Sequence, residues 1–100
     1  MGDLEGAIAE YRAALRIDPN DAAAHLNLGA ALGNTGDTEG AIAEFQAALN
    51  IDPNLAMAHS NLGAALVRIG DEEGAITEFR AALRIDPNLE KARGYLAALL

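Results

Sequence analysis

The chain contains no cysteine and no tryptophan, one lysine and only four aromatic side chains. Without cysteine it has no disulfide framework and no thiolate nucleophile. Four aromatic rings are too few for a bulky aromatic core, and much of the apolar fraction is alanine, which favours closely packed helices. The aromatic residues are Tyr11, Phe45, Phe79 and Tyr95.

Positive charge is also scarce. The 100 residues include 7 lysines and arginines against 15 aspartates and glutamates, which gives a formal net charge of -8. Phosphate backbones and anionic lipids are bound by lysine and arginine clusters, so we expect neither nucleic acid nor membrane partners. The acidic residues are spread along the chain and indicate a solvated surface. No apolar stretch has the length of a membrane span, and the N-terminus lacks a basic signal-peptide region, so a cytoplasmic location is expected.

Residue groupings that carry catalysis or metal binding are missing as well. There is no nucleophile elbow and no phosphate-binding loop, and Gly29, Gly33 and Gly36 do not have the dinucleotide-binding spacing. His25 and His59 are too far apart, about 10 Å on stacked helices, to form a metal site without further ligands. We therefore predict no enzyme activity, no cofactor and no metal, with both histidines as partly buried packing residues.

What is present is a repeated string of nineteen residues. GDLEGAIAEYRAALRIDPN, GDTEGAIAEFQAALNIDPN and GDEEGAITEFRAALRIDPN begin at residues 2, 36 and 70, and fourteen positions are identical in all three. The period of the repeat is therefore 34 residues. Such regular repetition is typical of a stacked array in which each unit contacts its neighbours.

Each repeated string predicts an amphipathic helix. In the middle copy the apolar stripe is formed by Ala41, Ile42, Phe45, Ala48 and Leu49. Asp37 is suited to cap the start of the helix, and Pro53 prevents its continuation. Asn54 is then expected to cap the next helix.

A second helical segment lies between the copies, over residues 22–32 and 56–66. Gly36 and Gly70 are expected to close the following turn in a left-handed conformation. Each 34-residue unit is thus a helical hairpin. Gly29 and Gly63 lie inside these segments, where glycine costs about 1 kcal/mol relative to alanine. We expect Gly29 to allow close approach of Ala41 and Phe45.

These residues resemble the tetratricopeptide repeat, whose 34-residue pattern contains Leu-Gly, alanine, an aromatic residue, alanine and a final proline. The pattern is matched by Leu28-Gly29, Ala41, Phe45, Ala48 and Pro53, by Leu62-Gly63, Ala75, Phe79, Ala82 and Pro87, and by the half unit Ala7, Tyr11, Ala14 and Pro19. The family tryptophan is replaced by His25 and His59.

The resemblance implies an all-α, right-handed superhelical solenoid of antiparallel helix hairpins. One domain over residues 1–100 would comprise a half repeat (2–21), two full repeats (22–55 and 56–89) and a terminal helix (89–100). The first helix of a unit is called A and the second B. Because the chain would start with a B helix, its six helices have the order B-A-B-A-B-A. The family binds proteins or peptides in a concave groove lined by the first helices and is not implied to be catalytic.

By analogy with the family, the groove is expected to be lined by Ala23, Leu26, Asn27, Ala30, Gly33, Asn34, Met57, Ser60, Asn61, Ala64, Val67, Arg68, Lys91, Gly94, Tyr95 and Ala98. Asn27 and Asn61 form an amide ladder, and an amide both donates to and accepts from a peptide backbone. A similar ladder occurs in the repeats of O-linked sugar transferases. Asparagine is also common at this position in the family for other reasons.

Some family members clamp a C-terminal carboxylate with two lysines, two asparagines and an arginine. Asn61 and Lys91 match that set, whereas Leu26, Ala30 and Tyr95 replace the other three. Because a carboxylate needs convergent positive charge, we do not expect this clamp here. The groove suits a short amphipathic helix or an extended apolar peptide of a protein partner.

The two ends offer an alternative function. The first helix (2–17) lacks the partner against which its Ala7 and Tyr11 normally pack, and the last helix (89–100) lacks the following one. The self-association residues we predict are Ala7, Tyr11, Leu96, Ala97, Leu99 and Leu100. Head-to-tail stacking or segment exchange would give a homo-oligomer. A longer parent chain that supplies the missing helices is the competing explanation.

Overall fold

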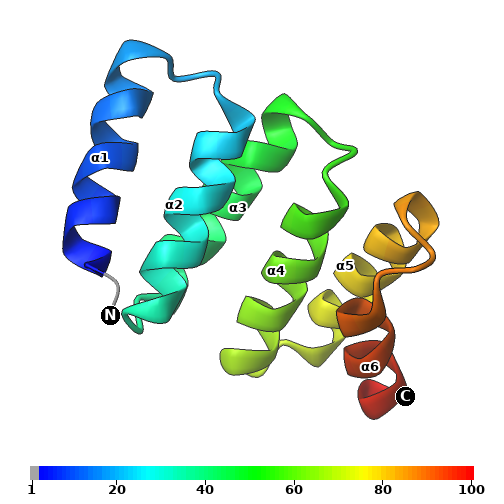
Figure 1. The fold of residues 1–100 in the computed structure, drawn as a ribbon. Coiled ribbons are helices and arrows are strands. Elements are labelled where there is room, and N and C mark those ends of the chain that lie inside the picture. The colour runs from blue at the N-terminus through cyan, green and yellow to red at the C-terminus, as the bar shows by residue number, and fades with distance from the viewer. Residues whose placement is uncertain (1–2) are drawn as a thin grey trace.

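The computed structural model describes residues 3–100, which form helices without any strand. The helices are α1 (Leu4–Ile17), α2 (Ala22–Asn34), α3 (Thr38–Ile51), α4 (Ala56–Arg68), α5 (Glu72–Ile85) and α6 (Glu90–Leu99) (Figure 1). The predicted helix start at Gly2 lies outside the described residues. α2 and α4 each run two residues beyond the predicted ends at Leu32 and Leu66.

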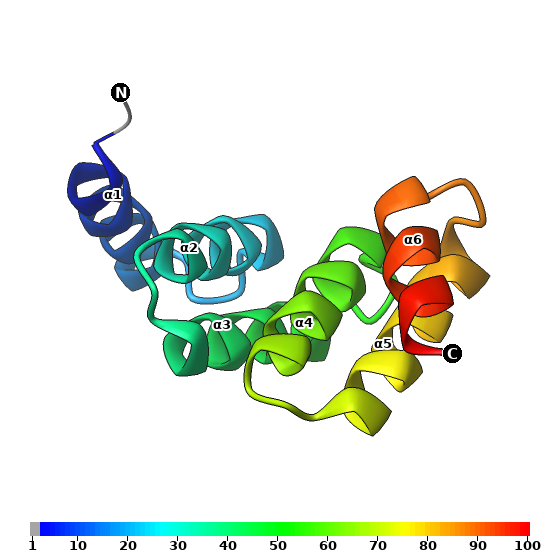
Figure 2. The same ribbon diagram turned by 90° about the horizontal axis from the view of Figure 1, so that it is seen from below.

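The helices stand side by side in chain order, from α1 at one end to α6 at the other (Figure 2). α2 packs most extensively on α3 and α4 on α5, so these pairs are the two complete hairpins. The described part measures 39 × 25 × 22 Å, as expected of a short stack in which each helix contacts mainly its neighbours. The predicted all-α solenoid of hairpins is confirmed.

Aspartate side chains begin most of the helices. Asp37 Oδ1 accepts a hydrogen bond from the Gly40 N–H at 2.9 Å, which confirms its predicted role. The prediction for Asn54 is wrong: Leu55 is the N-cap of α4 and offers no side-chain bond. The Asn54 N–H instead donates to Asp52 Oδ1 at 3.1 Å, which places Asn54 in the turn.

Glycine shapes the connections inside each hairpin. Gly36 and Gly70 have φ values of 92° and 85°, which confirms the predicted left-handed turns. A Cβ built on Gly29 lies 2.6 Å from Phe45 Cε1 and 3.2 Å from the Ala41 carbonyl oxygen. The predicted close approach at Gly29 is therefore confirmed, because no larger residue fits there without displacing α3 or its ring.

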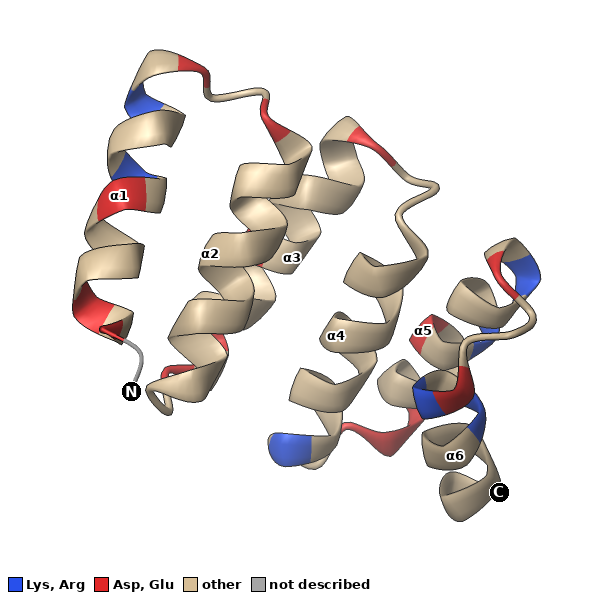
Figure 3. Cartoon of the chain, viewed as in Figure 1, with Lys and Arg blue, Asp and Glu red and all other residues tan. Residues whose placement is uncertain are grey.

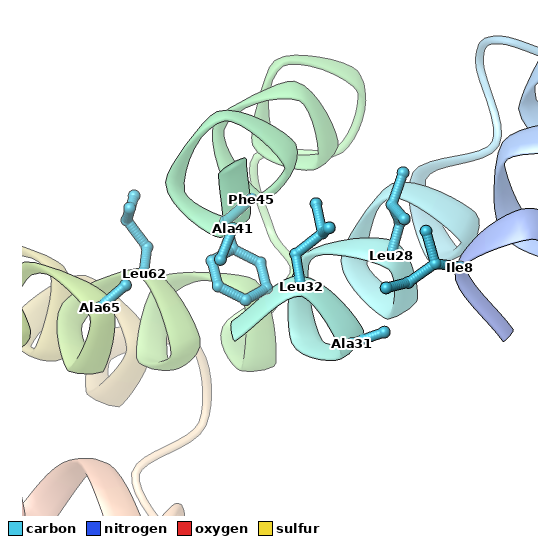
Figure 4. Packing of buried hydrophobic residues seen from close by; sticks show 8 residues of the cluster. All are labelled: Ile8, Leu28, Ala31, Leu32, Ala41, Phe45, Leu62 and Ala65. Atoms are coloured by element: carbon cyan, nitrogen blue, oxygen red, sulfur yellow. The ribbon is translucent and has the colours of Figure 1, made fainter. Parts of the chain in front are cut away.

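The hydrophobic core consists of two clusters along the stack. Figure 4 shows the first, formed by Ile8, Leu28, Ala31, Leu32, Ala41, Phe45, Leu62 and Ala65. The second is formed by Ala75, Phe79, Ala82 and Ala92. Leu66 packs against both and connects them. Small alanines at the contacts let the helices approach closely, as the composition predicted.

Candidate functional site

A groove of about 360 Å³ lies between the C-terminal half of α2, the face of α4 and the start of α6. Its lining comprises Ala30, Gly33, Asn34, Thr38, Phe45, Asn61, Ala64, Ala65, Arg68, Lys91 and Tyr95. Consecutive units therefore contribute to one depression through their first helices. With Thr38 and Phe45 of α3, the lining comes from four helices.

Half of the residues predicted for the groove meet in it. Ala30, Gly33, Asn34, Asn61, Ala64, Arg68, Lys91 and Tyr95 line it together. The remaining predicted residues, Ala23, Leu26, Asn27, Met57, Ser60, Val67, Gly94 and Ala98, do not. Ser60 is buried with 4% exposure, whereas the Met57 side chain is 48% exposed outside this depression. Of the two asparagines in the predicted ladder, only Asn61 lies in the groove.

Thr38, Phe45 and Ala65 line the groove although the sequence analysis did not assign them to it. Phe45 belongs to α3, the second helix of its unit, and its ring packs where Gly29 has no side chain. The sequence signal that could have assigned Phe45 to the groove was Gly29, because the missing Cβ leaves space for the ring.

The charged side chains of the groove are both cationic. Arg68 and Lys91 line it, and no carboxylate does. Figure 3 shows basic positions at the lower end of α4 and, beside an acidic one, in the first turn of α6. Arg68 Nη1 donates to the Gly33 carbonyl oxygen at 3.1 Å, which joins the end of α4 to the end of α2. The groove is therefore locally positive in a chain whose net charge is -8.

An aromatic pair forms the α6 side of the groove. The Tyr95 ring stacks on the ring of Phe79, with centroids 5.0 Å apart and an interplanar angle of 8°. Phe79 is fully buried, whereas Tyr95 is 36% exposed. The buried ring thus fixes the exposed one, and Tyr95 presents a preorganised apolar surface to the groove.

Each histidine connects the two helices of its hairpin with the turn that precedes the hairpin. His25 Nδ1 lies 2.7 Å from Glu44 Oε1, and its Nε2 lies 2.9 Å from the Pro19 carbonyl oxygen. His59 makes equivalent contacts with Glu78 and Pro53, also at 2.7 and 2.9 Å. Both side chains are 16% exposed, in agreement with the predicted partial burial. The glutamate partners were not predicted, because nineteen residues of sequence separate each pair.

The surroundings of His25 favour its protonated form. Burial lowers the pKa of the ring, but the hydrogen bond with Glu44 and the bond with the Pro19 carbonyl raise it, so the pKa lies above its ordinary value of 6.5. Both ring nitrogens face oxygen acceptors. Only the imidazolium can donate to both of them.

We expect the folded state to lose stability as the pH rises through the folded-state pKa of His25. Because that pKa is raised, the stabilisation is fully present below pH 6.5 and disappears above the folded value. Urea denaturation between about pH 6 and pH 8 measures the change. In a His25→Gln variant, the fall in stability over that range should be smaller. An unchanged slope in this variant would contradict the assignment.

Groups of three or more potential metal-ligating side chains are absent from residues 3–100. No helix in this described part is long and apolar enough to cross a membrane. The site is thus an open groove with an aromatic surface, two amides and two cations. The fold defines a class of protein, the helical-hairpin solenoid.

Two family models match the chain. The model described as TPR repeat matches residues 1–36 and 34–70, and the model described as tetratricopeptide repeat matches residues 56–89. The chain belongs to the tetratricopeptide repeat family. No curated protein matches the sequence.

Solved structures with the same fold come from several proteins. The first TPR of Spaghetti (RPAP3), bound to the HSP90 peptide SRMEEVD, has a TM-score of 0.95 at 22% identity, with 98% of this chain and 78% of that chain covered. MamA has a TM-score of 0.93 at 28% identity, with coverages of 98% and 57%. A mutant O-GlcNAc transferase of Thermobaculum terrenum has a TM-score of 0.92 at 31% identity. The match covers 99% of this chain and only 19% of the transferase.

Proposed function

We propose that this chain is a non-enzymatic protein-interaction module that holds a peptide segment of a partner in the groove between α2, α4 and α6. The observation that carries the proposal is the convergence of Asn61, Arg68, Lys91 and Tyr95 from α4 and α6 in one depression. The asparagine can hydrogen-bond to a peptide backbone, and the Tyr95 ring can pack on an apolar side chain.

The charges of the groove favour a segment with an acidic side chain beside apolar ones. Arg68 uses one N–H on the Gly33 carbonyl, which leaves other guanidinium donors available. Lys91 supplies a second positive charge from the opposite helix. With no carboxylate in the lining, an acidic group meets attraction from both sides and no nearby repulsion.

Similar proteins support a peptide ligand of this general kind. The first TPR of Spaghetti (RPAP3) is bound to an HSP90 peptide in its solved structure. In this chain Leu26, Ala30 and Tyr95 replace three polar or charged residues of the family's carboxylate clamp. We therefore propose a partner whose contact is mostly apolar and includes a single charge pair, rather than a clamped C-terminal tail.

Peptide selection followed by calorimetry tests this function. Random peptides displayed on phage are selected on the immobilised chain, and the enriched peptides are titrated into the purified protein. An Arg68→Glu, Lys91→Glu double variant should bind them at least about tenfold more weakly, because it replaces both attractions by repulsion. An Asn61→Ala variant should also weaken binding.

The matched control is Arg84→Glu, which reverses an exposed charge on α5 outside the groove lining. It should bind the selected peptides as tightly as the original chain. The proposal fails if no peptide is enriched. It also fails if the enriched peptides bind equally well to the double variant and to the control.

The exposure of the terminal helices favours a second candidate function, structural self-assembly. Ala14 of α1 is exposed, whereas the equivalent Ala48 and Ala82 have 0% exposure. On α6, Leu100 is 74% exposed, whereas Leu32, two periods earlier, is 6% exposed. We propose that these faces stack α6 of one copy on α1 of another. An increase of molecular mass with concentration tests the stacking.

A further inference from the structure

The inner hairpins show which side chains pair when a first helix packs on a second helix. In the α2–α3 hairpin, His25 pairs with Glu44 at 2.7 Å. These residues lie at a surface pocket that is also lined by Arg12 and Arg16 of α1. One period later, His59 of α4 pairs with Glu78 of α5 at the same distance. A histidine from the first helix thus meets a glutamate from the second helix in both complete hairpins.

The two ends of the stack carry the separate halves of this pair. Glu10 of α1 is the equivalent of Glu44 and Glu78 by the 34-residue period, and it is exposed. Arg93 of α6 occupies the position of the two histidines and is also exposed. The ion pairs within residues 3–100 are limited to the two histidine–glutamate pairs, so neither Glu10 nor Arg93 has an oppositely charged partner there.

Two further arginines accompany Arg93 at this end of the stack. Arg80 and Arg84 of α5 are the equivalents of Arg12 and Arg16, which line the pocket around His25. By the 34-residue period, Arg80, Arg84 and Arg93 thus take the places of Arg12, Arg16 and His25 at the α5–α6 end, where Arg93 lines a shallow pocket with Glu90. The opposite end, on α1, carries the glutamate at an exposed position.

We infer that a second copy of this chain docks through a charge-paired junction, in which its Glu10 lies against Arg80, Arg84 and Arg93 of the first copy. The inference rests on the proposed end-to-end assembly and specifies which side chains pair at the junction. α6 then packs on α1 of the second copy as α2 packs on α3. Only the head-to-tail arrangement pairs the charges, because two α1 ends would bring Glu10 against Glu10.

Apolar contacts of the inner hairpins predict the rest of the junction, with one difference. Ala97 occupies the position of Gly29 and Gly63, and it should lie against Tyr11 of the second copy. A Cβ at Gly29 lies 2.6 Å from Phe45 Cε1, so the Ala97 methyl group must displace the Tyr11 ring. The junction is therefore looser than an inner hairpin, and Ala97→Gly should strengthen self-association.

Charge reversal tests the junction by sedimentation velocity over a hundredfold range of protein concentration. The original chain should grow in mass with concentration. Glu10→Arg and Arg93→Glu should each weaken self-association at least about tenfold, because each places like charges together. The double variant with both changes should regain it in part, because residues 10 and 93 again carry opposite charges while Arg80 and Arg84 remain. An equimolar mixture of the two single variants should assemble more strongly than either alone, because residues 10 and 93 then carry opposite charges across every mixed junction.

Matched controls separate this pairing from a general effect of charge. Glu5→Arg changes an exposed α1 residue that lies at the Thr35 side of α2, and Lys91→Glu changes a groove residue. Neither should affect self-association. Circular dichroism should show the helical content of the original chain in all variants, since the altered residues are exposed.

The outcomes distinguish the two levels of the proposal. A constant monomer mass for the original chain at every concentration overturns both the assembly and the charge-paired junction. If the original chain assembles and the two charge-reversed variants assemble equally well, stacking is retained and the junction is overturned. The junction is also overturned if the mixture of single variants remains monomeric.

Discussion

Replacing Phe79 by alanine should lower the free energy of unfolding by about 3–5 kcal/mol. Phe79 has 0% exposure and is the largest side chain of the second core cluster. Its ring fills the space beside Gly63, where a Cβ would lie 2.8 Å from Phe79 Cε1, and it supports the ring of Tyr95. The substitution removes these contacts and leaves a cavity. Urea denaturation measured by circular dichroism gives the change.

Tyr11→Ala is the matched control, because Tyr11 occupies the same repeat position on α1. Its side chain is only partly buried where it packs against the first core cluster. The loss of stability in dilute monomer should therefore be less than half of that for Phe79→Ala. Equal losses would contradict the prediction that the partly buried Tyr11 contributes less stability than the fully buried Phe79.

A Gly29→Leu substitution should be nearly as damaging, with a loss of about 2–3 kcal/mol. The new side chain starts from a Cβ already 2.6 Å from the Phe45 ring and 3.2 Å from the backbone of Ala41. Relief requires the separation of α2 from α3, and these helices form one of the two most extensive contacts in the fold. Thermal or urea unfolding measures the loss.

Gly94→Leu provides the comparison, since a Cβ at Gly94 has no neighbouring atom within 4 Å. Leucine is the better helix former, so this variant should gain up to about 1 kcal/mol. The same substitution in two helices should thus have opposite signs. If Gly29→Leu is tolerated without loss, the close contact is not the reason for glycine at that position.

Most of the fold followed from the sequence because each unit repeats the same local signals. Asp37, Pro53 and Gly36 act on residues within a few positions of themselves, so their effects can be derived without knowledge of distant contacts. The error at Asn54 arose from a competition between two local bonds. Asp52 accepts the Asn54 N–H and holds the asparagine in the turn, so the helix starts one residue later.

The site was less predictable because it depends on contacts between units. The pairing of His25 with Glu44 requires the register between α2 and α3, which periodicity alone does not specify. Phe45 reaches the groove only because α2 has glycine at the facing position. Family analogy selected the correct helices for the groove, but not the depth at which Ser60 and Asn27 lie.

The placement of the two tyrosines has a practical consequence for spectroscopy. With no tryptophan in the chain, its intrinsic fluorescence comes from Tyr11 and Tyr95. Tyr95 lies in the groove, whereas Tyr11 lies on α1 at the other end of the stack and is partly buried. The two proposed binding events therefore occur at different fluorophores. Tyr11→Phe and Tyr95→Phe variants make each site readable separately, without an attached dye.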